Sequence, residues 1–146
     1  MARYLKKRDE IMNEKCVMII DEDLPLGEIA NTAAVLGITL GGKIPEAVGE
    51  NVSDGAGCPH AGVIKIPIPI LKARREDIGK LRLKLYERQF GDIAVVDFTK
   101  LAQSCKTYDE FIDKMSYTST LDYIGLALYG DRKKINKLTG NLPLMR

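Results

Sequence analysis

The run of apolar residues that follows Lys15 constrains the fold more than any other feature of the chain. The stretch Lys15–Ile20 reads KCVMII, and no charged side chain interrupts it after the lysine. A strand with one face in water alternates polar and apolar residues, whereas a continuous apolar run is typical of a strand covered on both faces. A helix rich in alanine is predicted soon afterwards, from Pro25 to Thr39. The sequence therefore predicts a central strand that lies between layers of helix.

The rest of the chain alternates between strand and helix patterns. Further strands are predicted over residues 63–71, 93–98 and 121–129, and further helices over residues 74–90, 107–116 and 131–138. This alternation favours an α/β fold in which helices flank a mixed or mostly parallel sheet, here of four strands. The length of 146 residues suits one domain, 1–146. Residues 1–14 are predicted to form a loose helix or a frayed arm of that domain.

Two prolines restrict where the second strand lies in the sheet. The segment Val63–Leu71 reads VIKIPIPIL, and its isoleucines alternate as expected for a strand. Pro67 and Pro69 have the same parity, so the N–H groups that they lack belong to the same lateral edge of the strand. A strand with two missing donors on one edge is tolerated at the rim of a sheet. We therefore expect this segment to be an edge strand.

The segment Gly41–Gly62 is the one long irregular stretch, and it contains the single histidine of the chain, His60. Irregular segments of this length are usually functional or mobile. One histidine excludes a two-histidine metal site, and Cys58 with His60 lacks the further pair that structural zinc needs. The glycines match neither standard phosphate-binding pattern. The sequence therefore predicts no metal site and no cofactor.

The charges are unevenly distributed although the formal net charge is only +2. Residues 16–58 carry seven acids and one base, whereas residues 72–88 carry seven bases and three acids. A net charge this small does not indicate nucleic-acid binding by itself, and the basic stretch has a plain interpretation as a solvated helix face. We expect one acidic end and one basic helix.

The cysteines and the hydropathy pattern predict where the protein is located in the cell. The three cysteines have no framework spacing, and Cys16 lies inside an apolar strand, where a thiol behaves as a small hydrophobic group. The N-terminus is charged and has no apolar core like that of a secretory signal. The longest uncharged run, Ile29–Gly42, is too short and too polar to span a bilayer. The expected location is the cytoplasm, without membrane attachment.

Three groups of side chains are candidates for chemistry. Asp97 ends an apolar strand, which is where ligands of α/β sheets bind, although it would equally serve to cap the helical turn near Thr99. His60 would act as a general base if it were paired with Asp54 or Asp97; the alternative is a loop residue without catalytic function. The acids at positions 21–23 follow the first strand, and their plain interpretation is to cap the next helix.

Two segments carry a resemblance to a known family. The strand KCVMIID followed by LPLGEIANTAAVLG resembles the opening of the type II peptidyl-tRNA hydrolases. The chain is more similar to a bacterial and archaeal family of unknown function in the same superfamily, by its DLPLGEIANTAAVLG segment and its IPIPILKA run. The resemblance covers roughly residues 14–130. It implies a peptidyl-tRNA hydrolase II-like fold and, by analogy, a homodimer.

The resemblance also identifies positions where the hydrolases carry functional residues. They have a lysine in the segment where the turn leads into the first helix, and this chain has Glu28 there. They also have an acid at the end of the third strand, followed by a threonine, and Asp97 and Thr99 resemble that arrangement. A carboxylate about 4 Å from a phosphate is unfavourable by roughly 1–4 kcal/mol, depending on solvent access. Glu28 therefore argues against nucleic acid as a partner.

Two functional hypotheses follow. The first is a non-hydrolytic module that binds a small polar ligand or a partner in a strand-end cleft. Its ligand-binding residues would be Glu28, Asn31, Thr32 and Asp97, with His60 nearby. The second is an ester hydrolase that acts on peptidyl- or aminoacyl-tRNA-like substrates, with Asp97, Thr99 and His60 as candidate catalytic residues.

Overall fold

The apolar run after Lys15 forms β1 (Glu14–Asp21), which pairs along both of its edges in the computed structural model. The structure describes residues 1–6 and 13–146. β1 lies parallel to β4 (Ile70–Ala73) and antiparallel to β6 (Tyr123–Asp131), and β6 pairs antiparallel with β5 (Ala94–Thr99). The strand order is β4-β1-β6-β5. The prediction of a mixed four-stranded sheet is therefore confirmed. The mostly parallel alternative is wrong, because β1–β4 is the one parallel pair among the three strand pairs of this sheet.

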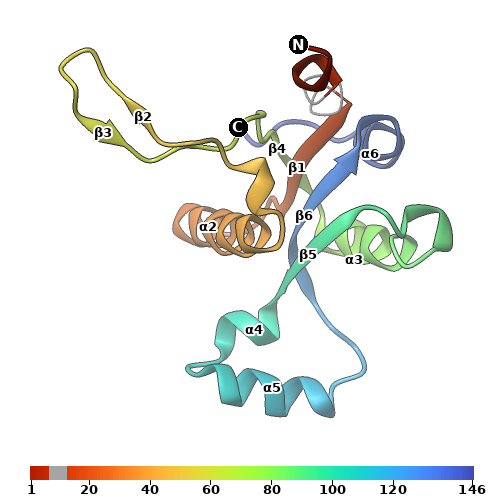
Figure 1. Cartoon of the computed structure of the whole chain (residues 1–146). Helices are drawn as coiled ribbons and strands as arrows, with labels where there is room; N and C mark the ends of the chain where they lie inside the picture. The colour runs from red at the N-terminus through yellow and green to blue at the C-terminus, as the bar shows by residue number, and fades with distance from the viewer. Residues whose placement is uncertain (7–12) are drawn as a thin grey trace.

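Helices cover both faces of this sheet (Figure 1). α2 (Leu26–Lys43) lies on one face, while α3 (Arg75–Lys84) and α6 (Arg132–Thr139) lie on the other. Alternate side chains of β1 enter the two resulting cores: Val17 and Ile19 on the α3 side, and Cys16, Met18 and Ile20 on the α2 side. All of them are buried, as the continuous apolar run predicted.

The approach of α2 to the sheet is close where it crosses Gly125 of β6. A Cβ atom on Gly125 would lie 2.6 Å from Cγ2 of Thr32 and 3.1 Å from Cδ1 of Leu36. Both of those side chains are fully buried. Only a glycine leaves room for the helix at this distance, so this contact fixes the position of the first half of α2 relative to β6.

The edge strand is confirmed in place but is shorter than predicted. β4 begins at Ile70, after both prolines, because Pro67 and Pro69 have no N–H to give to a ladder. The isoleucines before it still pack on the α2 side of the core. The C-terminal segment covers the free edge of β4, since the backbone of Lys72 donates to the Pro143 carbonyl at 2.9 Å and Met145 donates to that of Ile70 at 2.8 Å.

The remaining segments extend from the sheet or end early. The irregular stretch contains the 3-10 turn η1 (Pro45–Ala47) and a hairpin of β2 (Val52–Ser53) and β3 (Pro59–His60) that projects from the body (Figure 1). The helix predicted over 74–90 ends at Lys84, and the 3-10 turn η2 (Arg88–Phe90) follows. α5 (Tyr108–Ser116) is found as predicted, and the helical turn expected near Thr99 is the short α4 (Lys100–Ser104).

The predicted N-terminal arm is described only in part. Residues 2–6 are helical and exposed, and Glu14 already belongs to β1. Residues 7–12 of that arm lie outside the described residues. Among the described helices, none has the length and apolar character that crossing a membrane requires.

Candidate functional site

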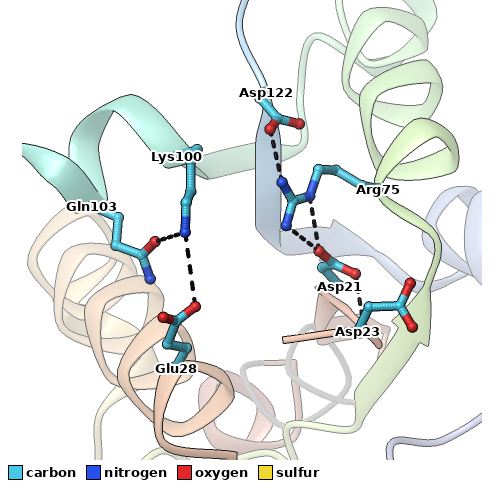
Figure 2. Close-up of polar contacts among 7 residues, drawn as sticks. All are labelled: Asp21, Asp23, Glu28, Arg75, Lys100, Gln103 and Asp122. Carbon is cyan, nitrogen blue, oxygen red and sulfur yellow. Dashed lines mark hydrogen bonds and ion pairs between the residues drawn. The ribbon is translucent and has the colours of Figure 1, made fainter. Parts of the chain in front are cut away.

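Three strands end at one edge of the sheet, where β6 begins. Asp21 at the end of β1 lies beside Ala73 at the end of β4, and Thr99 at the end of β5 lies beside Tyr123 at the start of β6. α2, α3 and α4 begin just beyond these ends. Ligands of open α/β sheets bind at such carboxyl ends. The side chains that meet there form what we call the strand-end cluster (Figure 2): Asp21, Asp23, Glu28, Arg75, Lys100, Gln103 and Asp122.

Arg75 joins two carboxylates on one side of the cluster. Its Nε and Nη2 lie 2.9 and 2.7 Å from Oδ2 of Asp21, and its Nη1 lies 2.9 Å from Oδ2 of Asp122. The Asp21 side chain is only 2% exposed, while that of Arg75 is 33% exposed. The other Asp21 oxygen accepts the backbone N–H of Asp23 at 3.0 Å. Hydrogen bonding to Asp21 raises the pKa of Arg75, so a buried acid holds a fixed cation at the end of the sheet.

Lys100 is held more weakly on the other side of the cluster. Its Nζ donates to Oε1 of Gln103 at 2.8 Å and lies 4.0 Å from a carboxylate oxygen of Glu28 on the first turn of α2. Its backbone N–H donates to the Asp122 carbonyl at 2.9 Å, which joins the two sides of the cluster. The Lys100 and Glu28 side chains are 48% and 41% exposed. Exposed ion pairs contribute about 0–1 kcal/mol, so a ligand can displace this one at small cost.

The cluster carries an excess of negative charge. Four carboxylates, on Asp21, Asp23, Glu28 and Asp122, stand against the two cations of Arg75 and Lys100. A polyphosphate approaching this edge would meet that excess, whereas an amine or a hydroxyl would find acceptors. The electrostatics of the site therefore favour a neutral or cationic polar ligand.

The structure places the three α2 candidates in different surroundings. Glu28 belongs to the strand-end cluster, and Asn31 lies on the exposed side of the helix. Thr32 is fully buried against Gly125, and its hydroxyl has no hydrogen-bond partner among the described residues. Of these three residues, only Glu28 is brought to the polar edge of the sheet.

Asp97 and Thr99 have structural partners of their own. Asp97 lies opposite Leu126, on the face that α3 covers, and accepts the Nε–H of Arg82 at 2.7 Å. Thr99 is buried after a register shift, and its hydroxyl accepts the Ala102 N–H at 3.1 Å as the N-cap of α4. The alternative that Asp97 caps this turn is therefore wrong. Because α2 covers the opposite face, Asp97 is not brought together with Glu28.

His60 lies in the projecting hairpin, away from α4 (Figure 1). Its Nε2 forms a hydrogen bond of 3.0 Å with Oδ2 of Asp54, whose Oδ1 accepts the N–H groups of Ala56 and Cys58. The hydrogen bond from His60 lowers the pKa of the Asp54 carboxyl. Of the two partners expected for His60, the structure shows Asp54, and the pair orders the turn of the hairpin.

The acids after β1 do not cap α2. Its N-cap is Pro25, which has no side-chain hydrogen bond to the helix, and Asp21 is used by Arg75 and Asp23 instead. That interpretation was wrong because Asp21 turns inward at the end of a buried strand. Sequence reasoning missed Arg75, which lies in the basic stretch interpreted as a solvated helix face, and Lys100, which begins α4. The position of each just after a strand was the signal that would have found them.

Among the described residues, no three His, Cys, Asp or Glu side chains are placed to hold a metal ion. The strand-end cluster offers two cations beside its acids, and the hairpin offers one histidine and one aspartate in contact. The strand-end cluster can form hydrogen bonds and ion pairs with a small molecule.

The fold and this cluster define an α/β protein with a polar strand-end site. A family model for proteins of unknown function, DUF2000, matches residues 14–146, and the chain belongs to that family. Its structure is similar to that of a protein of unknown function, Atu0240, from Agrobacterium tumefaciens strain C58. The two share 25% sequence identity with a TM-score of 0.82, and the match covers 92% of this chain and 98% of the other. No curated protein matches the chain.

Proposed function

We propose that this protein is a non-hydrolytic module that binds a small polar ligand at the strand-end cluster. The observation that carries the proposal is the Asp21–Arg75–Asp122 arrangement, in which a buried carboxylate fixes a half-buried guanidinium at the edge of the sheet. Burying a charge is costly unless it is paired, and an aliphatic pair would hold the end of β1 against the start of α3 as well. A pre-organised cation flanked by exposed acids supports a recognition role.

The charges around Arg75 select the class of ligand. The carboxylates of Glu28 and Asp122 are each close to half exposed and have one weak or shared cationic partner. A ligand that carries an amine and hydroxyl groups would satisfy these acceptors, and Gln103 would supply a neutral amide. Amino alcohols, polyamines and amino acids with a cationic side chain belong to this class.

The experiment is thermal unfolding in the presence of amines, polyols, amino acids and inorganic phosphate at millimolar concentration. A compound present at ten times its Kd stabilises the folded state by roughly 1.4 kcal/mol, or about 3–6 °C for a domain of this size. Glu28→Gln and Asp122→Asn should remove the shift, whereas Asp113→Asn on the exposed side of α5 should retain it. No shift with any cationic or neutral compound would refute the proposal.

The alternative activity is hydrolysis of peptidyl- or aminoacyl-tRNA esters. Arg82 and the start of α4 already engage Asp97 and Thr99, and no contact in the described part of the chain favours the hydrolase. We expect the purified protein to release no free tRNA from peptidyl-tRNA at high protein concentration, and we expect no salt-sensitive binding of tRNA.

The resemblance in the first helix and the IPIPILKA run supports three further expectations. They are kinship of the fold with the type II peptidyl-tRNA hydrolases, a homodimer and a cytoplasmic location. Light scattering on the purified protein tests the second, since a homodimer has the mass of two chains. Superposition on a solved type II hydrolase tests the first, and fractionation of the source cells tests the third.

A further inference from the structure

A cavity lies beside α4, and it shares no residue with the strand-end cluster. It is open to solvent, has a volume of about 390 Å³ and is lined by residues of α2, β5, α4, the chain at 105–107 and α5. Apolar side chains make most of its wall, among them Val35, Phe98 and Phe111. Ligand pockets typically have roughly 300–1,000 Å³ and a mainly apolar lining with a few polar groups. The size and the lining of this cavity fit that description.

The outer wall of the cavity is a helix whose apolar side chains are not covered. α5 has no buried residue, all of its residues being described, and Figure 1 shows it standing apart from the sheet next to α4. Tyr108 is 73% exposed, and Ile112 is 56% exposed. The rings of Tyr108 and Phe111 contact one another with centroids 5.5 Å apart. Packing of another apolar group against this pair would remove exposed aromatic surface from water.

The charge in the cavity wall is unbalanced. Its two charged residues are Asp97 and Lys106. The Asp97 carboxylate is engaged by Arg82 at 2.7 Å on the α3 side of the sheet. Lys106 is exposed, and its ammonium has no ion pair among the described residues. Glu110, which accepts the backbone N–H of Lys106 at 2.9 Å, forms its ion pair with Lys114 instead. The cavity wall therefore carries one lysine without an ion pair together with the aromatic residues Tyr108 and Phe111, which complements an anionic group on an apolar body.

We propose that this cavity binds a small aromatic carboxylate, with its ring against Tyr108 and Phe111 and its carboxylate toward Lys106. A cavity of about 150 Å³ holds a benzene ring, so about 390 Å³ leaves room for a ring with a short chain. The ring supplies the apolar contact that α5 lacks, and the carboxylate supplies the missing charge. This site is independent of the one proposed at the strand ends.

The reactivity of the Cys105 thiol can report whether the cavity is occupied. It lines the wall, is partly exposed, and its thiol donates to the Leu101 carbonyl at 3.2 Å. Cys58 is exposed in the hairpin, whereas Cys16 is buried, with its pKa raised to about 11 by burial. Cys58→Ser therefore leaves Cys105 as the thiol open to alkylation, and an occupant of the cavity shields it.

The test measures alkylation of Cys105 by iodoacetamide, followed by mass spectrometry, in the Cys58→Ser protein. 3-Phenylpropionate at ten times its Kd should slow the reaction about tenfold. The uncharged 3-phenylpropanamide should bind about two- to fivefold more weakly, the factor expected for an exposed ion pair. Propionate, which lacks the ring, should leave the rate unchanged.

Two variants and one control variant locate the binding. Lys106→Ala should lower the affinity for 3-phenylpropionate to that for the amide, while Lys133→Ala on α6 leaves it unchanged. Phe111→Ala should weaken both aromatic compounds, and because α5 has no buried residue, circular dichroism should show an unchanged fold. Equal rates of alkylation with and without 3-phenylpropionate, or equal binding of acid and amide, would overturn the proposal.

Discussion

Substitution of Gly125 by alanine tests whether the contact between α2 and the sheet is as close as the structure shows. The new Cβ would lie 2.6 Å from Cγ2 of Thr32, 3.1 Å from Cδ1 of Leu36 and 3.6 Å from the carbonyl oxygen of Ile19. Ordinary contacts of a Cβ begin near 3.4 Å. The helix or the strand must therefore shift by most of an ångström to accept one methyl group.

The size of the effect follows from the surroundings. β6 pairs with a strand on each side at this point, and Thr32 lies on the buried face of an 18-residue helix, so neither side yields freely. Overpacking a filled core by a methyl group costs about 1–3 kcal/mol. We expect Gly125→Ala to lie in the upper half of that range, which lowers Tm by roughly 4–12 °C for a domain of this length.

A double-mutant cycle with Thr32→Ser identifies the contact responsible. The serine keeps the hydroxyl and removes Cγ2, which alone costs about 1 kcal/mol of buried methyl contact. In the serine background, Gly125→Ala should cost at least about 1 kcal/mol less than in the parent, because the closest clash has gone. Urea unfolding at constant m value gives the four free energies. If the two changes simply add, the helix is not held where the structure places it.

Four further outcomes are expected. Thr32→Val should raise the free energy of unfolding by about 1 kcal/mol, since it replaces a buried hydroxyl without a partner by a methyl group; urea titration measures it. Asp21→Asn should lower the same quantity by about 2–3 kcal/mol, less than for a fully buried pair, because its arginine partner is one-third exposed. Gly79→Ala, in the middle of α3 with no atom near the added Cβ, should raise it by about 0.5–1 kcal/mol. The contact of His60 with Asp54 lowers the pKa of the Asp54 carboxyl. The contact therefore stabilises the folded state above the pKa of an unfolded aspartate, and this stabilisation is lost as pH falls through the lower pKa of the folded state. NMR titration of the Asp54 carboxyl should show a midpoint below that of an ordinary aspartate.

Local patterns in the sequence were sufficient to predict the elements but not how they pair. The apolar run of β1 and the spacing of α2 depend on burial, which leaves a direct trace in residue order. The isoleucines before β4 alternate like a strand because they do line one face of the core, yet the ladder starts only at Ile70, where the backbone regains its donors. The antiparallel direction of β6 depends on contacts between residues more than a hundred positions apart, which no local pattern records.

The candidate site was predicted in part for a similar reason. The rule that ligands bind at strand ends selected the edge of the sheet where the strand-end cluster lies, and the resemblance selected Glu28, which belongs to that cluster. The rule also selected Asp97, but the face on which a side chain lies depends on strand register, and Asp97 faces α3. Arg75 looked like part of a charged helix surface because the buried acid that pairs with it is 54 positions away in the sequence.

The strength of the partnerships separates the two functional hypotheses. Asp97 has a short hydrogen bond to a largely buried arginine, and Thr99 is buried as a helix cap, so each would have to give up a structural contact to take part in catalysis. Removing a partner from a buried polar group costs about 1–3 kcal/mol. Lys100 and Glu28 face no such cost, since their ion pair is long and exposed. A ligand can therefore replace the Lys100–Glu28 contact and leave the sheet intact, which supports the proposed binding module over a hydrolytic centre built on Asp97 and Thr99.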